Sequence, residues 1–257
     1  MIRSMVHLEQ ALKSKRFIGV VVYAGPSKID GKPIVAIANG IIAKSQNGKT
    51  GQMVQTWILA RDIAPHHAVK SGADVSVCGD CPLRPSLGGD SDCYVRTYQA
   101  PYQVWKSYHA GRYAVPGVDF DADLMPHIFA GLKLRFGAYG DPYAVPVKYW
   151  MPLKKYAANW TGYTHQWFKA PKALKTLCMA SIDEPWQLAT AHAMDWRTFR
   201  VKKKNETLTA WLEVGCPAAK ENGQRTNCAD CGLCKGNSIK AKNIVINDHG
   251  NKRHALA

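Results

Sequence analysis

Eight cysteines are the residues of this chain whose types and spacing most clearly point to chemistry. Four of them lie in the last quarter of the sequence, at Cys216, Cys228, Cys231 and Cys234. Two-residue gaps let a tight turn direct successive thiols toward one ion, and Gly232 and Gly236 permit such turns. Four thiolates can hold a tetrahedral zinc ion or a [4Fe–4S] cluster. The spacing therefore predicts a metal site and leaves Zn²⁺ and [4Fe–4S] open.

A second group of thiols, Cys78, Cys81 and Cys93, lies in the segment CGDCPLRPSLGGDSDCY. This segment is polar and rich in turn residues, so it has no apolar face to bury and something else must order it. Three protein ligands with one open position are typical of a catalytic metal or a substrate-binding cluster. A fourth ligand could come from Cys178, from a histidine, or from nothing. We expect Cys178, inside the apolar run LCMAS, to be a buried side chain rather than a ligand.

Three further polar residues follow segments that we predict to be strands: Asp141 in AYGDP, His165 in YTHQW and Asp183 in ASIDEP. A carboxylate in a dry pocket beside an aromatic ring acquires a pKa suited to acid–base chemistry. His165 is a candidate proton carrier or metal ligand. The structural alternatives are that Asp141 caps a turn, that Asp183 starts a helix, and that His165 is a hydrogen-bonded core residue.

The sequence elements that must position these residues predict an α/β fold. Apolar, β-branched runs predict strands at 17–25, 32–43 and 53–60, and helical spacing predicts a helix at 100–113. Further along, strands at 131–141, 159–167, 177–183, 196–201, 207–216 and 243–248 alternate with an interrupted helix at 142–158 and a helix at 184–195. Such alternation favours a mainly parallel sheet with functional groups at the carboxyl ends of its strands.

We therefore predict a single α/β domain over residues 1–257, most similar to a partial or modified (β/α) barrel. Cysteine-rich, metal-binding loops would be inserted at 78–94 and 216–236.

The charge of the chain predicts an anionic partner. Of its 257 residues, 34 are Lys or Arg and 19 are Asp or Glu, which gives a net charge of +15. The hydrophobic fraction of 46% excludes disorder or a coiled coil for the whole chain. Nucleic acid is the commonest partner of such a protein, an acidic membrane surface is the next, and a merely cationic soluble protein is the alternative. The predicted nucleic-acid contacts are Arg200, Lys202, Lys203, Lys204, Tyr163 and Trp167.

No apolar run approaches the length of a membrane span, since the longest covers about residues 17–25. The first 16 residues carry charges where a signal peptide would need an apolar stretch. We therefore expect a cytoplasmic protein whose cysteines stay reduced, which favours metal ligands or catalytic groups over disulfides. The oligomeric state stays open.

The order of several motifs resembles a family of phage proteins similar to gene product 88. The resemblance runs from about residue 20 to residue 250 and rests on GKPIVAIANG, CGDCP…CY, LRFGAYGDP, WTGYTHQW, ASID, WRTFRV, CP…CADCGLC and IVINDHG. It implies a phage or prophage origin, and hence the cytoplasm of an infected bacterium, together with a cysteine scaffold. It implies no particular substrate.

Two enzyme classes are similar in a looser way, and each implies a function. Barrel-type tRNA-guanine transglycosylases and their DNA-directed phage relatives carry a C-terminal zinc site, which implies base exchange with Asp141 as nucleophile or base and Asp183 as its partner. Radical S-adenosylmethionine enzymes combine a partial barrel, a three-cysteine cluster and often an auxiliary cluster, which implies iron–sulfur chemistry. A third hypothesis is a non-enzymatic module, stapled by two metal sites, that binds nucleic acid or a host protein.

Overall fold

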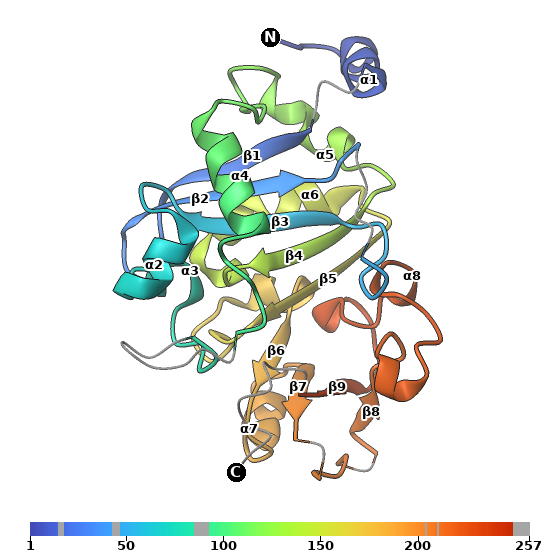
Figure 1. Cartoon of the computed structure of the whole chain (residues 1–257). Coiled ribbons are helices and arrows are strands. Elements are labelled where there is room, and N and C mark those ends of the chain that lie inside the picture. Colours follow the sequence, from blue (N-terminus) through green and yellow to red (C-terminus); the bar gives the residue numbers. More distant parts are fainter. Residues whose placement is uncertain (15–17, 43–46, 85–92, 204, 210, 249–257) are drawn as a thin grey trace.

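One nine-stranded sheet organises the chain in the computed structural model (Figure 1), which describes all residues except 15–17, 43–46, 85–92, 204, 210 and 249–257. Its strands lie in the order β1-β2-β3-β4-β5-β6-β7-β9-β8. They are β1 (Gly19–Pro26), β2 (Pro33–Asn39), β3 (Val54–Ala60), β4 (Lys133–Tyr139), β5 (Asn159–Thr164), β6 (Met179–Ile182), β7 (Thr198–Lys202), β8 (Glu213–Gly215) and β9 (Asn243–Asn247).

The sheet changes from antiparallel to parallel pairing at β3. Strands β1, β2 and β3 form an antiparallel meander, and every later neighbour pair from β3–β4 to β9–β8 is parallel. Strands β1 and β8 stand at the two ends of the strand order, so the sheet is open. The prediction of a mixed α/β fold with a mainly parallel sheet is confirmed, but the strands do not close into a barrel.

Short helices connect the strands. The α-helices are α1 (Met5–Lys13), α2 (Pro65–Ser71), α3 (Val75–Cys78), α4 (Ala100–His109), α5 (Met125–Ile128), α6 (Met151–Lys155), α7 (Gln187–Ala193) and α8 (Cys228–Cys231). The 3₁₀ turns are η1 (Ala122–Leu124), η2 (Pro142–Ala144), η3 (Val147–Tyr149), η4 (Lys172–Thr176), η5 (Lys220–Asn222) and η6 (Gly236–Ser238). Helix α4 crosses one face of β1–β3, and α5 and α6 lie behind the sheet (Figure 1).

Burial explains why strand β2 is so apolar, although both of its neighbours run antiparallel to it. Residues 34–38 of β2 are all fully buried, as expected for a strand that is covered on both faces. Behind β4, Phe136 packs against the fully buried Trp150, with ring centroids 5.5 Å apart. The indole N–H of Trp150 donates to the Pro142 carbonyl, which fixes the interrupted helix η2–η3–α6 against the sheet.

Two of the predicted nucleic-acid contacts are instead interior residues. Arg200 is only 1% exposed and donates to both carboxylate oxygens of Glu213 at 2.8 and 2.9 Å, as well as to Glu206. Trp167 is 6% exposed and belongs to the hydrophobic core. The prediction that these side chains contact nucleic acid is therefore wrong, because neither can reach a phosphate or a base.

The other predicted nucleic-acid contacts that the structure describes are not in the core. Tyr163 is half-buried and its ring packs on Phe199, with centroids 4.4 Å apart. Lys202 ends β7 and Lys203 follows it on the surface. Lys204 lies outside the described residues.

The buried pair between Arg200 and Glu213 generates a stability prediction. Burial opposes the carboxylate, but the Arg200 guanidinium and the Thr209 amide outweigh it and lower the pKa of Glu213 below its ordinary value of 4.5. The pair therefore stabilises the fold above about pH 4.5, and this contribution is lost as the pH falls through the lowered pKa. Glu213→Gln should cost about 3 kcal/mol at pH 7, since it leaves a buried guanidinium short of its partner.

Urea unfolding at pH 7 and pH 4, followed by tryptophan fluorescence, measures both effects. The matched control is Asp62→Asn, which removes the exposed ion pair with Arg61 and should leave the midpoint unchanged. A Glu213→Gln variant as stable as the wild type at pH 7 would contradict this account of the pair.

Candidate functional site

Asp141 connects three segments at the carboxyl end of the parallel strands. It follows β4, its own N–H donates to the Val77 carbonyl of α3 at 2.6 Å, and its side chain is buried. One carboxylate oxygen accepts the Tyr143 N–H at 2.9 Å and the other accepts the His165 N–H at 2.8 Å. The chain reaches this position through Gly140, whose φ of +80° and close approach to Ile58 leave no space for a Cβ atom.

These contacts bring the three predicted catalytic residues together. Asp141, His165 and Asp183 directly follow or lie just beyond the neighbouring strands β4, β5 and β6, as the sequence predicts. The His165 Nε2 atom lies 3.4 Å from Asp183 Oδ1 and 4.0 Å from the Cys81 sulfur. Asp141 therefore fixes the backbone of His165, and the imidazole extends from that point to the second carboxylate.

Burial distinguishes the two carboxylates. Burial raises the pKa of Asp141, although the Thr164 hydroxyl and two backbone amides oppose the rise. Burial alone would lower the pKa of His165, but hydrogen bonds to Asp183 and Cys81 outweigh it and raise that pKa to about 10. The Asp183 side chain is 27% exposed, so it can meet a ligand that arrives from solvent.

Exposed aromatic and cationic side chains surround this edge of the sheet. Phe168 is 53% exposed and Trp186 is 70% exposed, and they follow His165 and Asp183 by three residues each. Lys202 and Lys203 lie at the same end of β7, the strand next to β6. Sequence reasoning did not find Phe168 and Trp186, because an apolar ring beside a strand end is more often buried.

The first cysteine group borders a cavity beside this edge. Cys78 ends α3, and the Cys81 N–H donates to the Cys78 carbonyl across a tight turn. A cavity of about 410 Å³ is lined by Cys78, Cys93, Val69, Asp74, Arg84, Val95, Arg96, Thr97, Tyr98 and Tyr139. Arg84 pairs with Asp74 through two bonds of 2.7 and 2.8 Å. Cys178 lies apart from this group, in the core against Gly162, as expected for a buried thiol.

The second cysteine group lies beside β5. Helix α8 contains Cys228 and Cys231, and the Cys234 carbonyl accepts the N–H of Gly162 at 3.3 Å. Cys216 and Cys234 are buried in one small cluster with Met179 and Ile244, and Cys228 packs against it. Burial raises the pKa of Cys234, a hydrogen bond with Tyr163 opposes the rise, and the nearby thiols of Cys216, Cys228 and Cys231 add to it.

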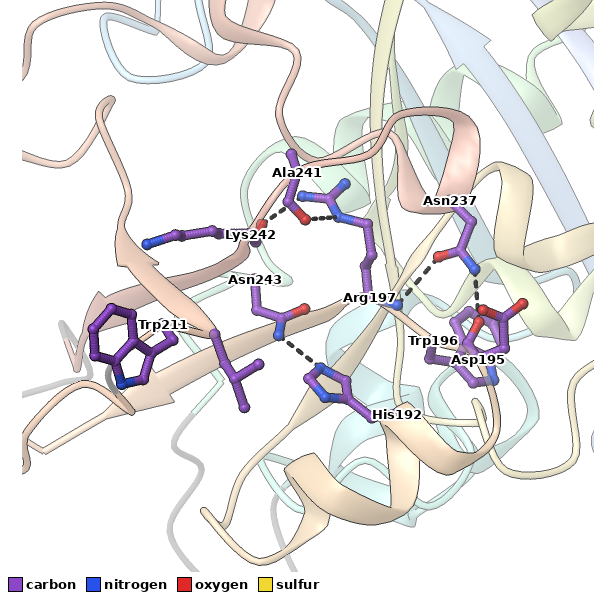
Figure 2. Close-up of a pocket in the computed structure, with 10 residues that line it drawn as sticks. His192, Asp195, Trp196, Arg197, Trp211, Asn237, Ala241, Lys242 and Asn243 are labelled. Carbon is purple, nitrogen blue, oxygen red and sulfur yellow. Dashed lines mark hydrogen bonds between the residues drawn. The ribbon is translucent and has the colours of Figure 1, made fainter.

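Arg197 fastens this cysteine segment to the sheet. Its guanidinium donates to the carbonyls of Leu233, Gly236, Ala241 and Lys242 at 2.7–2.9 Å. Figure 2 shows Arg197 between Ala241 and Asn237, beside a second cavity of about 410 Å³. That cavity lies at the amino ends of β7 and β9, so it is on the other edge of the sheet from Asp183.

Metal binding stays a prediction for both cysteine groups. Within the described part of the chain, no three or more His, Cys, Asp or Glu side chains are arranged as a group that could hold a metal ion. The same residues contain no helix long and apolar enough to span a membrane. No family model, curated protein or solved structure matches the chain.

The position of Asp141 predicts that it matters for stability more than Asp183 does. Asp141→Ala removes the acceptors of two backbone amides at once, so it should lower the free energy of unfolding by about 2–3 kcal/mol. Asp183→Ala should lower it by less than about 1 kcal/mol, because that side chain is partly exposed. Urea unfolding of the two variants measures the difference, and equal losses would refute the assignment of Asp141 as the connecting residue.

Proposed function

We propose that the protein is an enzyme that modifies nucleic-acid bases by base exchange at the carboxyl edge of its parallel sheet. The observation that carries the proposal is the contact of His165 Nε2 with Asp183 Oδ1, in a backbone position that Asp141 fixes. A proton carrier held against a reachable carboxylate at adjacent strand ends is the arrangement that covalent exchange at a sugar carbon needs.

The geometry favours Asp183, rather than Asp141, as the nucleophile. Both oxygens of Asp141 accept backbone N–H groups and its side chain is buried, which suits a positioning residue. Asp183 has an oxygen beside His165 and a side chain that is 27% exposed. The resemblance to transglycosylases suggests Asp141 as nucleophile or base and Asp183 as its partner. In this proposal Asp183 is the nucleophile and Asp141 positions His165.

The reaction would proceed by two displacements at the sugar carbon C1′. An Asp183 oxygen forms a bond to C1′ while the glycosidic C–N bond breaks, and the departing base nitrogen takes the electron pair and a proton from His165. A free purine-like base then gives its proton to His165 and attacks C1′, which releases the Asp183 carboxylate. Each bond that forms is matched by one that breaks, and His165 and Asp183 return to their starting states.

The surroundings of Asp183 support a nucleic-acid substrate. Lys202 and Lys203 stand at the end of the adjacent strand, where cations can neutralise phosphates. The exposed rings of Phe168 and Trp186 offer faces on which a flipped or unpaired base can stack. The net charge of +15 favours the same class of partner.

The four C-terminal cysteines suit a structural metal by their chemistry. Cys216, Cys228 and Cys234 already share one small cluster, and Cys231 lies on the same short helix as Cys228. Bound there, Zn²⁺ or a [4Fe–4S] cluster would stabilise the segment that Arg197 fastens to the sheet. Neither would take part in the exchange.

Nucleoside profiles test the proposal. Cells expressing the wild-type protein should contain an altered base in DNA or tRNA, and cells expressing Asp183→Asn should not, because the amide cannot attack C1′. Glu184→Gln is the matched control, since it changes the neighbouring carboxylate and should preserve the wild-type profile. Digestion to nucleosides followed by mass spectrometry measures all three.

A result in which the wild type, Asp183→Asn and cells without the protein give identical profiles, with folded protein present, would overturn base exchange. Oligonucleotide binding that survives in both variants would then favour the non-enzymatic binding module.

A further inference from the structure

We infer that Cys78, Cys81 and Cys93 hold a thiolate-bound metal centre, whose sulfurs accept hydrogen bonds from Tyr139 and Gln166 and whose open position faces the adjoining cavity. The shared chemistry is that of a thiophilic metal, either Zn²⁺ or an iron–sulfur cluster. This inference does not rest on base exchange, because a metal centre can be present whatever reaction the edge of the sheet performs.

Gln166 is the first sign of an absent partner. Its side chain is completely buried, and neither its carboxamide nitrogen nor its oxygen has a hydrogen-bond partner within the residues that the structure describes. Burying an unsatisfied amide costs free energy, so such groups normally face a ligand or an ordered water. The carboxamide packs on Gly79, between Cys78 and Cys81, where an added Cβ atom would lie 2.6 Å from Gln166 Nε2.

Tyr139 is the second sign, and it comes from a different element. It ends β4, is 5% exposed, and its buried hydroxyl also lacks a partner among the described residues. The ring lines the same cavity as Cys78 and Cys93. Two orphaned donors, from β4 and from the segment after β5, thus lie beside one group of thiols. Hydrogen bonds of this kind orient metal ligands and adjust the affinity of the site.

The structure also limits which group could be the fourth ligand of a metal held by Cys78, Cys81 and Cys93. Cys178 is buried in the core and its sulfur lies against Gly162, so it is not a ligand. His165 Nε2 lies closer to Asp183 Oδ1 than to the Cys81 sulfur, so we assign this nitrogen to its contact with Asp183. The remaining open direction from Cys78 and Cys93 is the cavity, whose wall includes Arg96 and Tyr98. A small donor molecule could reach the metal through it.

Binding would convert three thiols into thiolates. Each thiol loses its proton as a sulfur–metal bond forms, and the sulfurs move to about 2.3 Å from the metal if the metal is zinc. In the structure these thiols are not arranged around one point, so binding would draw them together; Cys78 and Cys81 already share one tight turn.

Metal analysis of the anaerobically purified full chain tests the ligands. Zinc and iron per chain are measured by plasma mass spectrometry, and an absorption spectrum distinguishes a colourless zinc protein from a brown iron–sulfur protein. The double variant Cys78→Ser/Cys93→Ser should lose one metal centre per chain relative to the wild type. The loss is one zinc ion if the centre is zinc, or the iron of one cluster if it is iron–sulfur. The control Cys178→Ser should hold as much metal as the wild type. Equal metal content in the double variant and the wild type would overturn the inference.

The outer hydrogen bonds are tested by metal release to a chelator, with folding checked by circular dichroism. Tyr139→Phe and Gln166→Leu remove only the orphaned polar groups, and each should weaken metal binding about 10- to 100-fold. Tyr98→Phe, which changes an exposed tyrosine on the wall of the same cavity, should release metal at the wild-type rate. Wild-type release from both Tyr139→Phe and Gln166→Leu would show that these groups do not face a metal centre.

Discussion

The buried carboxylate of Asp141 is the interaction on which the site depends. Neighbouring parallel strands present their carboxyl ends at one edge, but nothing in the strands themselves fixes the chain beyond that edge. Asp141 supplies this constraint by accepting one N–H from the turn after β4 and another from His165 after β5. Its own N–H binds the carbonyl of Val77, which also places the adjacent Cys78. One residue thus sets the positions of the histidine and of the first cysteine group.

The two cysteine groups occupy different environments, and this difference suggests different roles. The C-terminal group is fastened to the sheet, since the Cys234 carbonyl accepts the N–H of Gly162 in β5 and Arg197 binds carbonyls of the same segment. The first group lies beside a cavity and two buried donors, the side chains of Tyr139 and Gln166, that have no partner within the part of the chain the structure describes. A metal in the C-terminal group would therefore be structural, and a metal in the first group would be accessible to a small molecule.

Much of the architecture was predictable because local patterns control it. The β-branched runs predict the strands of the sheet, and their alternation with helices predicts both the parallel pairing and the gathering of Asp141, His165 and Asp183 at one edge. Closure of the sheet was not predictable, because it depends on strand tilt and stagger, which the hydrophobic pattern does not encode. Helix α1 was also missed, although Ser4 caps it and Leu8 buries against the core.

Burial of individual polar and aromatic residues was the least predictable property. Arg200 stands in a basic stretch and reads as a surface cation, yet Glu213, thirteen residues away, pairs with it in the interior. Trp167 and Phe168 are neighbours in sequence, but the first is in the core and the second is exposed. Gln166 resembles an ordinary polar residue, and only the complete burial of a carboxamide that has no partner among the described residues connects it with the cysteines. Such pairings depend on contacts distant in sequence.

The most direct test of the central claim is to look for the covalent intermediate that exchange through Asp183 requires. Intact-protein mass spectrometry after incubation with oligonucleotides, in the absence of any free base, should detect a protein–oligonucleotide adduct for the wild type and none for Asp183→Asn. An adduct of equal yield in the Asp183→Asn variant, or no adduct for a wild-type protein that changes nucleoside profiles in cells, would contradict the account.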